Sequence, residues 1–504
     1  MKQYLIIGVL MATAAITAGR VFAQLPDPTP EKLPVWRGFN LLEKFIKGSP
    51  GSGPYKEDDF RLIAEWGFNF VRLPLDYRFW IKNGDWTQID EAAFADLDQA
   101  VAFGRKYNIH VCMNFHRAPG YTVARPAESS DLWTDPEAQR LCAMHWAYFA
   151  RRYKGVPNSH LSFNLLNEPA NIDGPTYLKV VEKLAAAIRA EDPNRLIIAD
   201  GLQWGRSPCQ ELRPLRIAQA TRGYEPFGLT HYMASWVEGA DQWPRPEWPA
   251  PILGGGYLFS PSKPDLHSPV TLTAELYEPA TLTITVGTVS RQARLVVQRE
   301  GQEIWAQDFA PGPGEGPWKE VVFKSEWNSY QNIYDRPYEV SLPAGRYTLT
   351  LDNTRGDWLT LTGLALTSAN GKHAALTLRP RWGQPNEPIS VASSAGGCTF
   401  QAVRRQDADW LWNDHYACWS DFRENGSGAM VGEWGAHNQT PHEVTLCWME
   451  DVLKTFRRAG MGWALWNFRG SFGIMDSGRA DVQYEDFHGH KLDRKMLDLL
   501  QKYE

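Results

Sequence analysis

The sequence predicts a (β/α)8 barrel, also called a TIM barrel, with an inserted β-sandwich domain in the loop after strand six. Three observations carry this prediction. Short apolar strands alternate with amphipathic helices before residue 250, and the same alternation returns after residue 400. Between these parts, apolar and polar residues alternate with a period of two. Strand–helix repeats indicate a parallel sheet covered by helices, whereas period-two alternation indicates a β-sandwich.

Eight apolar stretches account for the barrel strands. Five come first, and helical patterns follow the first four of them: VWRGFNLL, FNFVRLPLD, IHVCMNFH, LSFNLLNEP and RLIIADG. RIAQATRGY is the sixth strand, and AMVGEWG and GWALWNF are the seventh and eighth. Eight repeats are typical of a closed barrel. The alternative is a doubly wound open sheet, which the sequence does not support with a Gly-rich phosphate loop.

The middle of the chain predicts the second domain. Its strand patterns are VTLTAELYEPATLTITVGT, ARLVVQREG, YEVSLPAGRYTLTLDNT and WLTLTGLALTS, punctuated by glycine and proline. We therefore expect the catalytic barrel at 24–250 and 401–504 and the sandwich at 251–400. The sandwich is either carbohydrate-binding or structural. Its aromatic residues fit a binding surface and a sandwich core equally well: Trp305, Trp318, Trp327 and Trp358.

Residues 1–23 have the pattern of a signal peptide. Lys2 precedes the apolar core YLIIGVLMATAAITAG, and VFA before Gln24 fits a small-residue cleavage site. No later stretch has the roughly 20 apolar residues of a membrane span. We therefore expect a secreted or periplasmic protein without a membrane association after cleavage. The alternative is an uncleaved N-terminal anchor.

Charge and cysteine usage narrow the function classes. The net charge is -6, and no basic patch stands out, so a nucleic acid is not an expected partner. The six cysteines form no C-x-x-C pair, so a zinc site is not indicated. We expect no metal and no cofactor. The oligomeric state and any disulfide pairing stay open.

The carboxyl ends of the predicted barrel strands hold the candidate functional residues, because functional groups of such barrels gather there. Two of these residues are carboxylates: Glu168 closes strand four and Glu433 closes strand seven. Paired carboxylates without metal ligands or a cofactor motif are the equipment for glycoside hydrolysis. Each residue alone also has a structural explanation, such as a solvated turn for Glu168. The other strand-end residues are Arg72, His116, Asn167, Tyr224 and Trp466.

Taken in order, the motifs resemble those of the family 5 glycoside hydrolases. NEP follows strand four, VGEWG lies at strand seven and GWALWNF at strand eight, while GFNFVRLPL and VCMNFH match the arginine and histidine patterns of strands two and three. The resemblance covers about 24–250 and 400–504. It implies a retaining mechanism in which Glu168 is the general acid/base and Glu433 is the nucleophile. It also implies that Arg72 and Tyr224 keep Glu433 ionised.

The resemblance implies three further contacts with substrate. Asn167 would bind the sugar 2-hydroxyl, His116 would line the site, and Trp466 would form its floor. An indole suits this last role because the C–H faces of sugars are apolar.

The sequence departs from the family pattern at strand six. Members commonly show His-x-Tyr there, and this chain reads Arg222-Gly223-Tyr224. Tyr224 matches, and Arg222 replaces the histidine. A second placement would use His231 and Tyr232, but we prefer Tyr224 because YEPFGLTH then aligns throughout. His231 remains a substrate-binding candidate from the same segment.

The resulting hypothesis is a secreted retaining glycoside hydrolase that cleaves β-glycosidic bonds in a polysaccharide such as β-1,4-glucan, in the manner of an endoglucanase. Its expected partner is a polysaccharide or oligosaccharide substrate. Two alternatives stay open: a non-catalytic carbohydrate-binding relative, and a retaining hydrolase of another β-glycan such as mannan or xyloglucan. Glu168 and Glu433 favour catalysis, whereas Arg222 favours the non-catalytic alternative.

Overall fold

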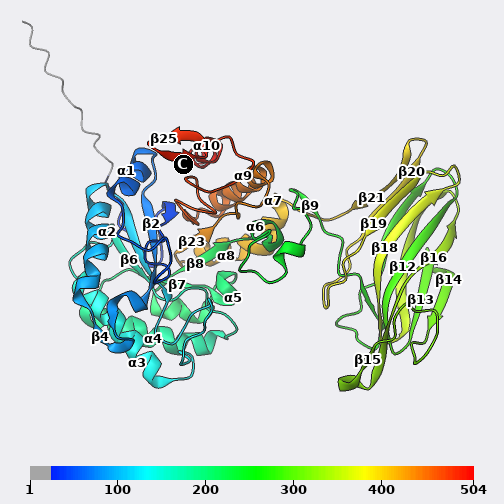
Figure 1. The fold of residues 1–504 in the computed structure, drawn as a ribbon, viewed down its shortest axis with the longest axis horizontal. Coiled ribbons are helices and arrows are strands. Elements are labelled where there is room, and N and C mark those ends of the chain that lie inside the picture. Colours follow the sequence, from blue (N-terminus) through cyan, green and yellow to red (C-terminus); the bar gives the residue numbers. More distant parts are fainter. Residues whose placement is uncertain (1–23, 504) are drawn as a thin grey trace, which may run out of the picture. The chain divides into compact units, whose positions relative to one another are not determined.

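The computed structural model describes residues 24–503, which form two compact units (Figure 1). One unit contains the described residues up to Arg245 together with those from Trp412 onward, and the other is Pro246–Leu411. The expected signal peptide, residues 1–23, lies outside the described residues. Within the described range, no helix is both long and apolar enough to cross a membrane.

The first unit is a closed barrel of eight parallel strands, which confirms the predicted fold. The strand order is β1–β2–β5–β6–β7–β8–β23–β24, and β24 pairs with β1. The sandwich is inserted between β8 and β23, which are barrel strands six and seven, as expected. The strands are β1 (Arg37–Asn40), β2 (Phe70–Asp76), β5 (His110–Arg117), β6 (Leu161–Asn164), β7 (Ile197–Asp200), β8 (Ala218–Gly223), β23 (Ala429–Trp434) and β24 (Trp463–Leu465).

Helices cover the outside of the barrel, as Figure 1 shows for α1 to α4. The longer ones are α1 (Glu57–Glu65), α2 (Ala95–Lys106), α3 (Pro136–Arg152), α4 (Gly174–Glu191), α8 (Ala417–Glu424), α9 (His442–Ala459) and α10 (Arg494–Lys502). Short elements lie in the connections: α5 (Leu202–Gly205), α6 (Phe227–Thr230), and the hairpins β3 (Ile81–Lys82) with β4 (Asp85–Ile89) and β25 (Glu485–Phe487) with β26 (His490–Leu492).

Sequence signals explain where the helices begin and end. The Asp135 side chain accepts a hydrogen bond from the Glu137 backbone N–H at the start of α3, and Pro136 occupies its first turn. Gly460 ends α9 in the left-handed region. A 3-10 turn, Glu91–Phe94, directly precedes α2.

The second unit is a β-sandwich of two sheets. One sheet has the order β10–β18–β12–β16–β15, with β19 also pairing with β18, and the other has the order β14–β13–β17–β11–β20–β21. Leucine, isoleucine and valine side chains from both sheets form a common core. The first sheet contains β10 (Tyr257–Phe259), β12 (Ala280–Ser290), β15 (Phe323–Lys324), β16 (Ser329–Leu342), β18 (Trp358–Ser368) and β19 (His373–Thr377). The second contains β11 (Val270–Leu276), β13 (Ala293–Arg299), β14 (Gln302–Phe309), β17 (Gly345–Gly356), β20 (Ile389–Ser394) and β21 (Gly397–Ala402).

Within the two sheets of the sandwich, β11 and β20 pair in parallel, whereas the other neighbouring strands pair antiparallel. Where the chain enters and leaves this unit, β9 (Ala250–Pro251) pairs with β22 (Arg405–Gln406). Such pairing holds the two ends of the insertion side by side. All six cysteines lie in the described range as free thiols.

Candidate active site

Glu433 lies at the carboxyl end of β23 and is buried. Its Oε1 accepts a hydrogen bond of 2.6 Å from Arg72 Nη1, and its Oε2 accepts one of 3.1 Å from the Tyr224 hydroxyl. The pairing between β23 and β8 is irregular between Val431 and Glu433. Such irregularities re-aim a side chain at a strand end. One cationic and one neutral donor therefore hold the two oxygens of the Glu433 side chain in place.

Arg72 is the centre of a buried polar network beneath Glu433. Its Nη1 also donates to Asn40 Oδ1, at 3.0 Å. Its Nε donates to Asn164 Oδ1 and its Nη2 to Asn167 Oδ1, both at 3.0 Å. A planar guanidinium with three engaged nitrogens has little freedom to move, so Arg72 presents a fixed positive charge to Glu433.

Glu168 lies in a turn that follows β6, with its backbone in the left-handed region (φ 50°). Two contacts hold this backbone: Glu168 N–H donates to Asp200 Oδ2 at 2.8 Å, and its carbonyl accepts from the Tyr121 hydroxyl at 2.7 Å. Left-handed backbone is uncommon for residues other than glycine and persists where its surroundings hold it. These contacts hold the residue that follows the buried strand β6 in a conformation that directs its carboxyl group into the polar network.

The surroundings of Glu168 favour its protonated form. Burial raises the pKa of the Glu168 carboxyl to about 7, the negative charges of Glu433 and Asp200 act in the same direction, and Arg222 opposes them. Glu168 and Glu433 therefore share one site in which one carboxyl group is pushed toward the neutral state. Such a division suits a general acid beside an ionised partner.

Arg222 joins the two glutamates. It lies on β8, where the family pattern has histidine. Its Nε donates to Glu168 Oε1 at 3.0 Å, and its Nη2 lies 3.3 Å from Glu433 Oε1. The same Nη2 donates to Asn167 Oδ1 at 2.9 Å and forms an ion pair with Asp200. One buried guanidinium thus contacts three carboxylates. Arg222, which stands where the family pattern has histidine, is therefore part of the site.

His116 and Trp466 lie next to Glu433. His116 Nδ1 is 4.0 Å from Glu433 Oε1 and has no hydrogen-bond partner within the described part of the chain. Burial lowers the pKa of His116 well below its usual range, and the positive charges of Arg72 and Arg222 add to this shift. The imidazole is therefore neutral. The half-buried Trp466 ring stacks on His116 with a centroid distance of 5.7 Å.

His231 lies at the edge of the cluster and meets it through Tyr224. Its ring packs edge-on against Tyr224 at 5.1 Å and stacks on Phe227 at 4.0 Å. Its Nδ1 is 3.0 Å from Thr230 Oγ1, and burial lowers its pKa to about 3. His231 therefore supports the Tyr224 ring. The strand-end position is occupied by Tyr224, and the alternative pair His231–Tyr232 does not take it.

Three residues of the network were not among the sequence candidates for the site: Asn40, Asn164 and Asp200. Asp200 closes β7 and binds Arg222, Asn164 Nδ2 and the Glu168 backbone. The other candidates were polar side chains at the ends of barrel strands. Asp200 also meets this criterion. Asn40 at the end of β1 meets the same criterion. The signal was therefore present in the sequence.

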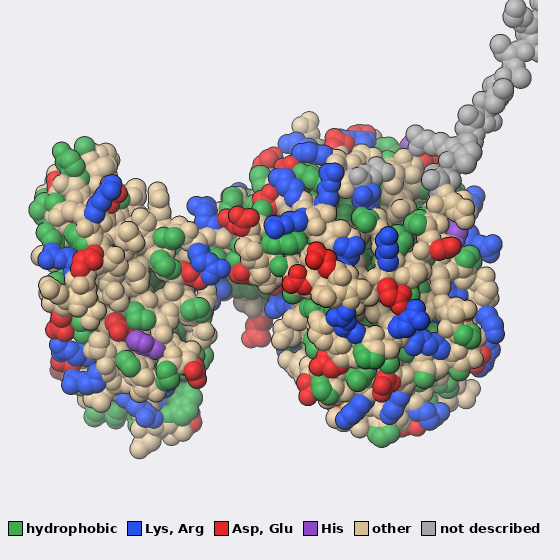
Figure 2. Space-filling view, turned by 180° about the vertical axis from the view of Figure 1, so that it is seen from behind, with side chains coloured by type: hydrophobic (Ala, Val, Ile, Leu, Met, Phe, Trp, Pro, Cys, Tyr) green, Lys and Arg blue, Asp and Glu red, His purple; other side chains and the backbone are tan. Residues whose placement is uncertain are grey.

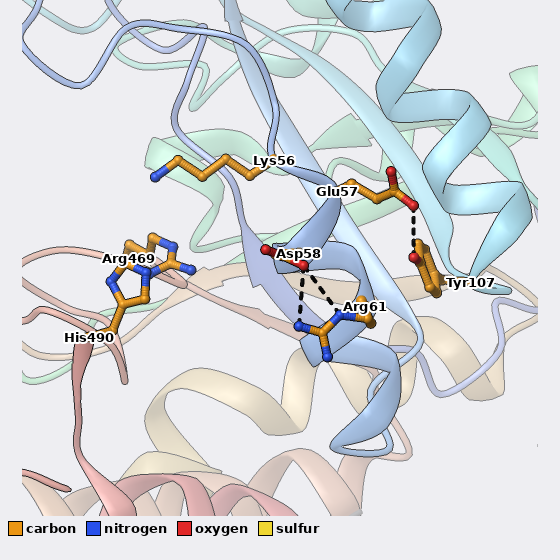
Figure 3. A pocket seen from close by; sticks show the side chains of 7 residues that line it. All are labelled: Lys56, Glu57, Asp58, Arg61, Tyr107, Arg469 and His490. Atoms are coloured by element: carbon orange, nitrogen blue, oxygen red, sulfur yellow. Dashed lines mark hydrogen bonds and ion pairs between the residues drawn. The ribbon is translucent and has the colours of Figure 1, made fainter. Parts of the chain in front are cut away.

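The barrel unit also has a cavity lined by residues outside this cluster (Figure 3). It has a volume of about 520 Å³ and lies beside the start of α1. Its charged side chains pair with neighbours: Asp58 with Arg61, Glu57 with Tyr107 and Lys106, and His490 with Asp476. None of its lining residues belongs to the Glu168–Glu433 cluster. Across the described residues, no group of three or more His, Cys, Asp or Glu side chains is placed to hold a metal ion.

Comparison with known proteins finds relatives of the first part of the barrel unit. Residues 31–221 match the family model of cellulase (glycosyl hydrolase family 5). Endoglucanase C of Acetivibrio thermocellus is 32% identical over 190 residues, which are 36% of this chain and 54% of the relative. Cellodextrinase A of Ruminococcus flavefaciens is 28% identical over 36% of this chain and 55% of the relative. The aligned part thus spans about half the length of these relatives.

Solved structures extend the likeness to most of the chain. The crystal structure of one glycoside hydrolase has a TM-score of 0.60 and 27% identity, and the match covers 93% of this chain and 99% of that one. Cel5A of Thermotoga maritima, solved with mannotriose, has a TM-score of 0.53 at 16% identity, covering 94% and 100% of the two chains. This second likeness concerns the fold alone.

The barrel is similar in sequence and fold to glycoside hydrolases of the cellulase-like class. The expected resemblance is confirmed: residues 31–221, which belong to the barrel unit, match the model of glycosyl hydrolase family 5. The matched range contains Arg72, His116, Asn167 and Glu168, whereas Glu433 follows after the inserted sandwich. The structure brings Glu433 back to the matched residues through the closed barrel.

Proposed function

We propose that this chain is a retaining glycoside hydrolase that cleaves β-glycosidic bonds of a polysaccharide, with β-1,4-glucan as the first candidate substrate. One observation carries the proposal. Glu168 and Glu433, which are far apart in the sequence, contact the same buried guanidinium of Arg222, and burial raises the pKa of the Glu168 carboxyl to about 7. An acid and an ionised nucleophile at one site are what retaining hydrolysis needs.

In the first step, a Glu433 oxygen attacks the anomeric carbon of the bound sugar. The bond from that carbon to the glycosidic oxygen breaks, and Glu168 gives its proton to the leaving oxygen. A covalent glycosyl-enzyme and a free sugar hydroxyl result. Arg72 and Tyr224 hold Glu433 in its ionised, attacking form through their hydrogen bonds.

In the second step, the Glu168 carboxylate takes a proton from water. The water oxygen attacks the same anomeric carbon, and the bond to Glu433 breaks. Two displacements on one carbon return the original anomeric configuration. Glu168 recovers its proton and Glu433 its negative charge, so the site is ready for another cycle.

Asn167 is the proposed ligand of the sugar 2-hydroxyl. Its Oδ1 accepts hydrogen bonds from both Arg72 and Arg222, which fixes the orientation of the amide. Its buried Nδ2 has no partner among the described residues. An unpaired buried donor is costly in the free protein, so a substrate hydroxyl that accepts from it contributes to binding. Trp466 supplies an apolar face for the sugar ring, and the neutral His116 lines the site beside it.

Activity on soluble polysaccharides tests the proposal. The assay measures new reducing ends from β-1,4-glucan, mixed-linkage glucan, mannan and xyloglucan, with Glu168→Gln and Glu433→Gln as matched controls. We expect turnover of at least one polysaccharide by the unaltered chain and a large loss in both variants. No turnover on any substrate, including aryl β-glycosides, would favour the non-catalytic carbohydrate-binding alternative.

We further propose that the protein is exported, either secreted or periplasmic. The signal-peptide pattern of residues 1–23 supports this. Mass spectrometry of the protein recovered from the culture medium or the periplasm should find Gln24 as the first residue. Recovery only in the membrane fraction with an intact N-terminus would support the anchor alternative.

A further inference from the structure

A cavity lined by aromatic and charged side chains lies within the sandwich unit. It has a volume of about 660 Å³ and lies at one end of the sheet β10–β18–β12–β16–β15. The register of the sheet places Phe259 opposite Trp358, and Ser290 opposite Gln331, at this same end. Residues from several neighbouring strands thus contribute to it, among them Tyr257, Arg291, Lys324, Trp327, Trp358 and Trp382.

Aromatic rings form one wall of this cavity. Trp358 is nearly buried, and it meets Tyr257 at a centroid distance of 5.3 Å. Trp382 stands almost perpendicular to Trp358, with an interplanar angle of 89°, and it also packs against Tyr257. Inner rings therefore fix the orientation of an outer one. A rigid aromatic surface loses little conformational entropy when it binds a ligand.

The outer tryptophans are exposed to an unusual extent. Trp382 is 59% exposed and Trp327 is 56% exposed, whereas Trp305 and Trp318 pack against the hydrophobic core of the sandwich. The sequence alone gave these tryptophans no separate roles. In Figure 2, hydrophobic side chains also gather at the lower end of the sandwich unit, the end at which β15 lies in Figure 1. Exposed aromatic surface of this kind marks a binding site more often than scattered single residues do.

Polar groups complete the lining. Lys263 pairs with Asp357 at 2.6 Å, and Asp357 also accepts from the Ser290 hydroxyl. Arg291 and Lys324 form no ion pair within the described part of the chain. Among the described residues, the Arg291 guanidinium donates a single hydrogen bond, of 3.3 Å, to the Trp327 carbonyl. The cavity therefore offers donors with unused capacity beside flat apolar rings.

We propose that this cavity is a glycan-binding site, separate from the catalytic one, that holds sugar rings against Trp327 and Trp382. Pyranose rings present apolar C–H faces and a rim of hydroxyl groups. The faces match the exposed indoles, and the hydroxyl or carboxylate oxygens of the rim accept hydrogen bonds from Arg291 and Lys324. Because the barrel is similar to glycoside hydrolases, a second glycan site in the same chain has an evident use: it raises the local concentration of substrate.

The test measures polysaccharide binding by the full-length chain with Glu168→Gln, which suppresses turnover. Affinity electrophoresis in gels that contain hydroxyethyl cellulose, glucomannan or glucuronoxylan gives the dissociation constants. We expect retardation by at least one of these, and a loss of about 5- to 10-fold in affinity when Trp382→Ala or Trp327→Ala is added.

Tyr277→Ala is the matched control. Tyr277 is an aromatic residue with 75% exposure, and it lies near the start of β12, whereas the cavity lies near its end. Eleven residues of extended strand separate the two sites by roughly 35 Å. This variant should bind as the parent does. Equal affinities in the tryptophan variants and the control would overturn the proposal, as would the absence of binding to every polysaccharide.

A second measurement separates this inference from the proposed catalysis. In a background with Glu168 intact, Trp382→Ala and Trp327→Ala should keep the kcat/KM of the parent on a small aryl glycoside, because such a substrate needs only the barrel site. Circular dichroism verifies the fold of both variants. A loss of turnover that equals the loss of polysaccharide binding would contradict a separate site, whatever becomes of the roles of Glu168 and Glu433.

Discussion

The strands of the barrel and those of the sandwich differ in how deeply they bury their side chains. All eight residues of β5 are buried, and so are all seven of β2. In β11, buried residues alternate with exposed or half-exposed ones. A polar side chain in a barrel strand must therefore find a partner inside the protein, whereas one on the outer face of the sandwich is hydrated.

This difference indicates which polar residues matter for the structure and the site: those that are buried and hydrogen-bonded. Arg72 and Arg222 are buried and engage several carboxylate and amide oxygens each. Arg346 on the sandwich pairs with Glu275 in full contact with solvent, with 78% and 61% of the two side chains exposed. Substitutions should therefore have large and specific effects in the first group and small ones in the second.

The largest effect is expected at Glu433. Glu433→Gly removes the proposed nucleophile, so kcat should fall by about 10⁴-fold or more on any substrate. With an activated aryl glycoside, azide should restore turnover, because the small anion occupies the vacated space and attacks the anomeric carbon once. The product should be a glycosyl azide of inverted configuration, which NMR identifies. Glu443→Gly, on the exposed side of α9, is the control. Absence of rescue in a folded variant would remove the nucleophile role.

Glu168 should show a loss that depends on the leaving group. Glu168→Gln cannot donate a proton, and general acid catalysis contributes on the order of 10²–10⁴-fold. The loss of kcat/KM should be large for a polysaccharide, whose leaving alkoxide needs the proton. It should be much smaller for a dinitrophenyl glycoside, whose leaving group does not. Steady-state kinetics on both substrates checks this, and equal losses would contradict the role of Glu168 as the acid.

Arg222 should set the basic limb of the pH profile. Glu168 must be protonated in the first step, so kcat/KM should fall as the pH rises through its pKa, about 7. Arg222 stabilises the carboxylate and thus lowers this pKa. Arg222→His should therefore move the basic limb to higher pH, while Arg222→Lys should hold it near the parent position. A limb that stays in place in both variants would show that Arg222 does not act on Glu168.

The smallest effect is expected on the outer face of the sandwich. Arg346→Ala removes a solvent-exposed ion pair, which contributes less than about 1 kcal/mol to the free energy of unfolding. Urea unfolding should give a midpoint close to that of the parent, and activity on an aryl glycoside should not change. A substantial loss of stability would mean that exposure is a poor guide to the weight of a charged residue in this molecule.

Much of the fold could be predicted from the sequence because each barrel strand is a short apolar run with a polar end. LSFNLLNEP and AMVGEWG have this form, and the structure has β6 and β23 at these places. The inserted sandwich was visible because its strands change to a period of two. The parallel pairing of β11 with β20 could not be predicted, because period-two alternation does not indicate which strand is the neighbour.

The site was predictable in its residues and less so in its connections. The positions of Arg72 and Glu433 at strand ends predict them as site residues, and in the structure Arg72 Nη1 lies 2.6 Å from Glu433 Oε1. The role of Arg222 could not be found from the sequence, because it depends on which side chains the barrel closure brings within reach of one guanidinium. Asp200 was overlooked for a simpler reason: an aspartate before glycine also fits an ordinary turn.

The most direct test of the central claim follows the anomeric configuration of the first product. The substrate is the β-glycan that the activity screen identifies, and ¹H NMR records the anomeric protons within the first minutes of hydrolysis. Two displacements by Glu433 and water predict that the β-anomer appears first and the α-anomer later, as mutarotation proceeds. Initial release of the α-anomer would contradict a covalent intermediate on Glu433 and require a single displacement by water.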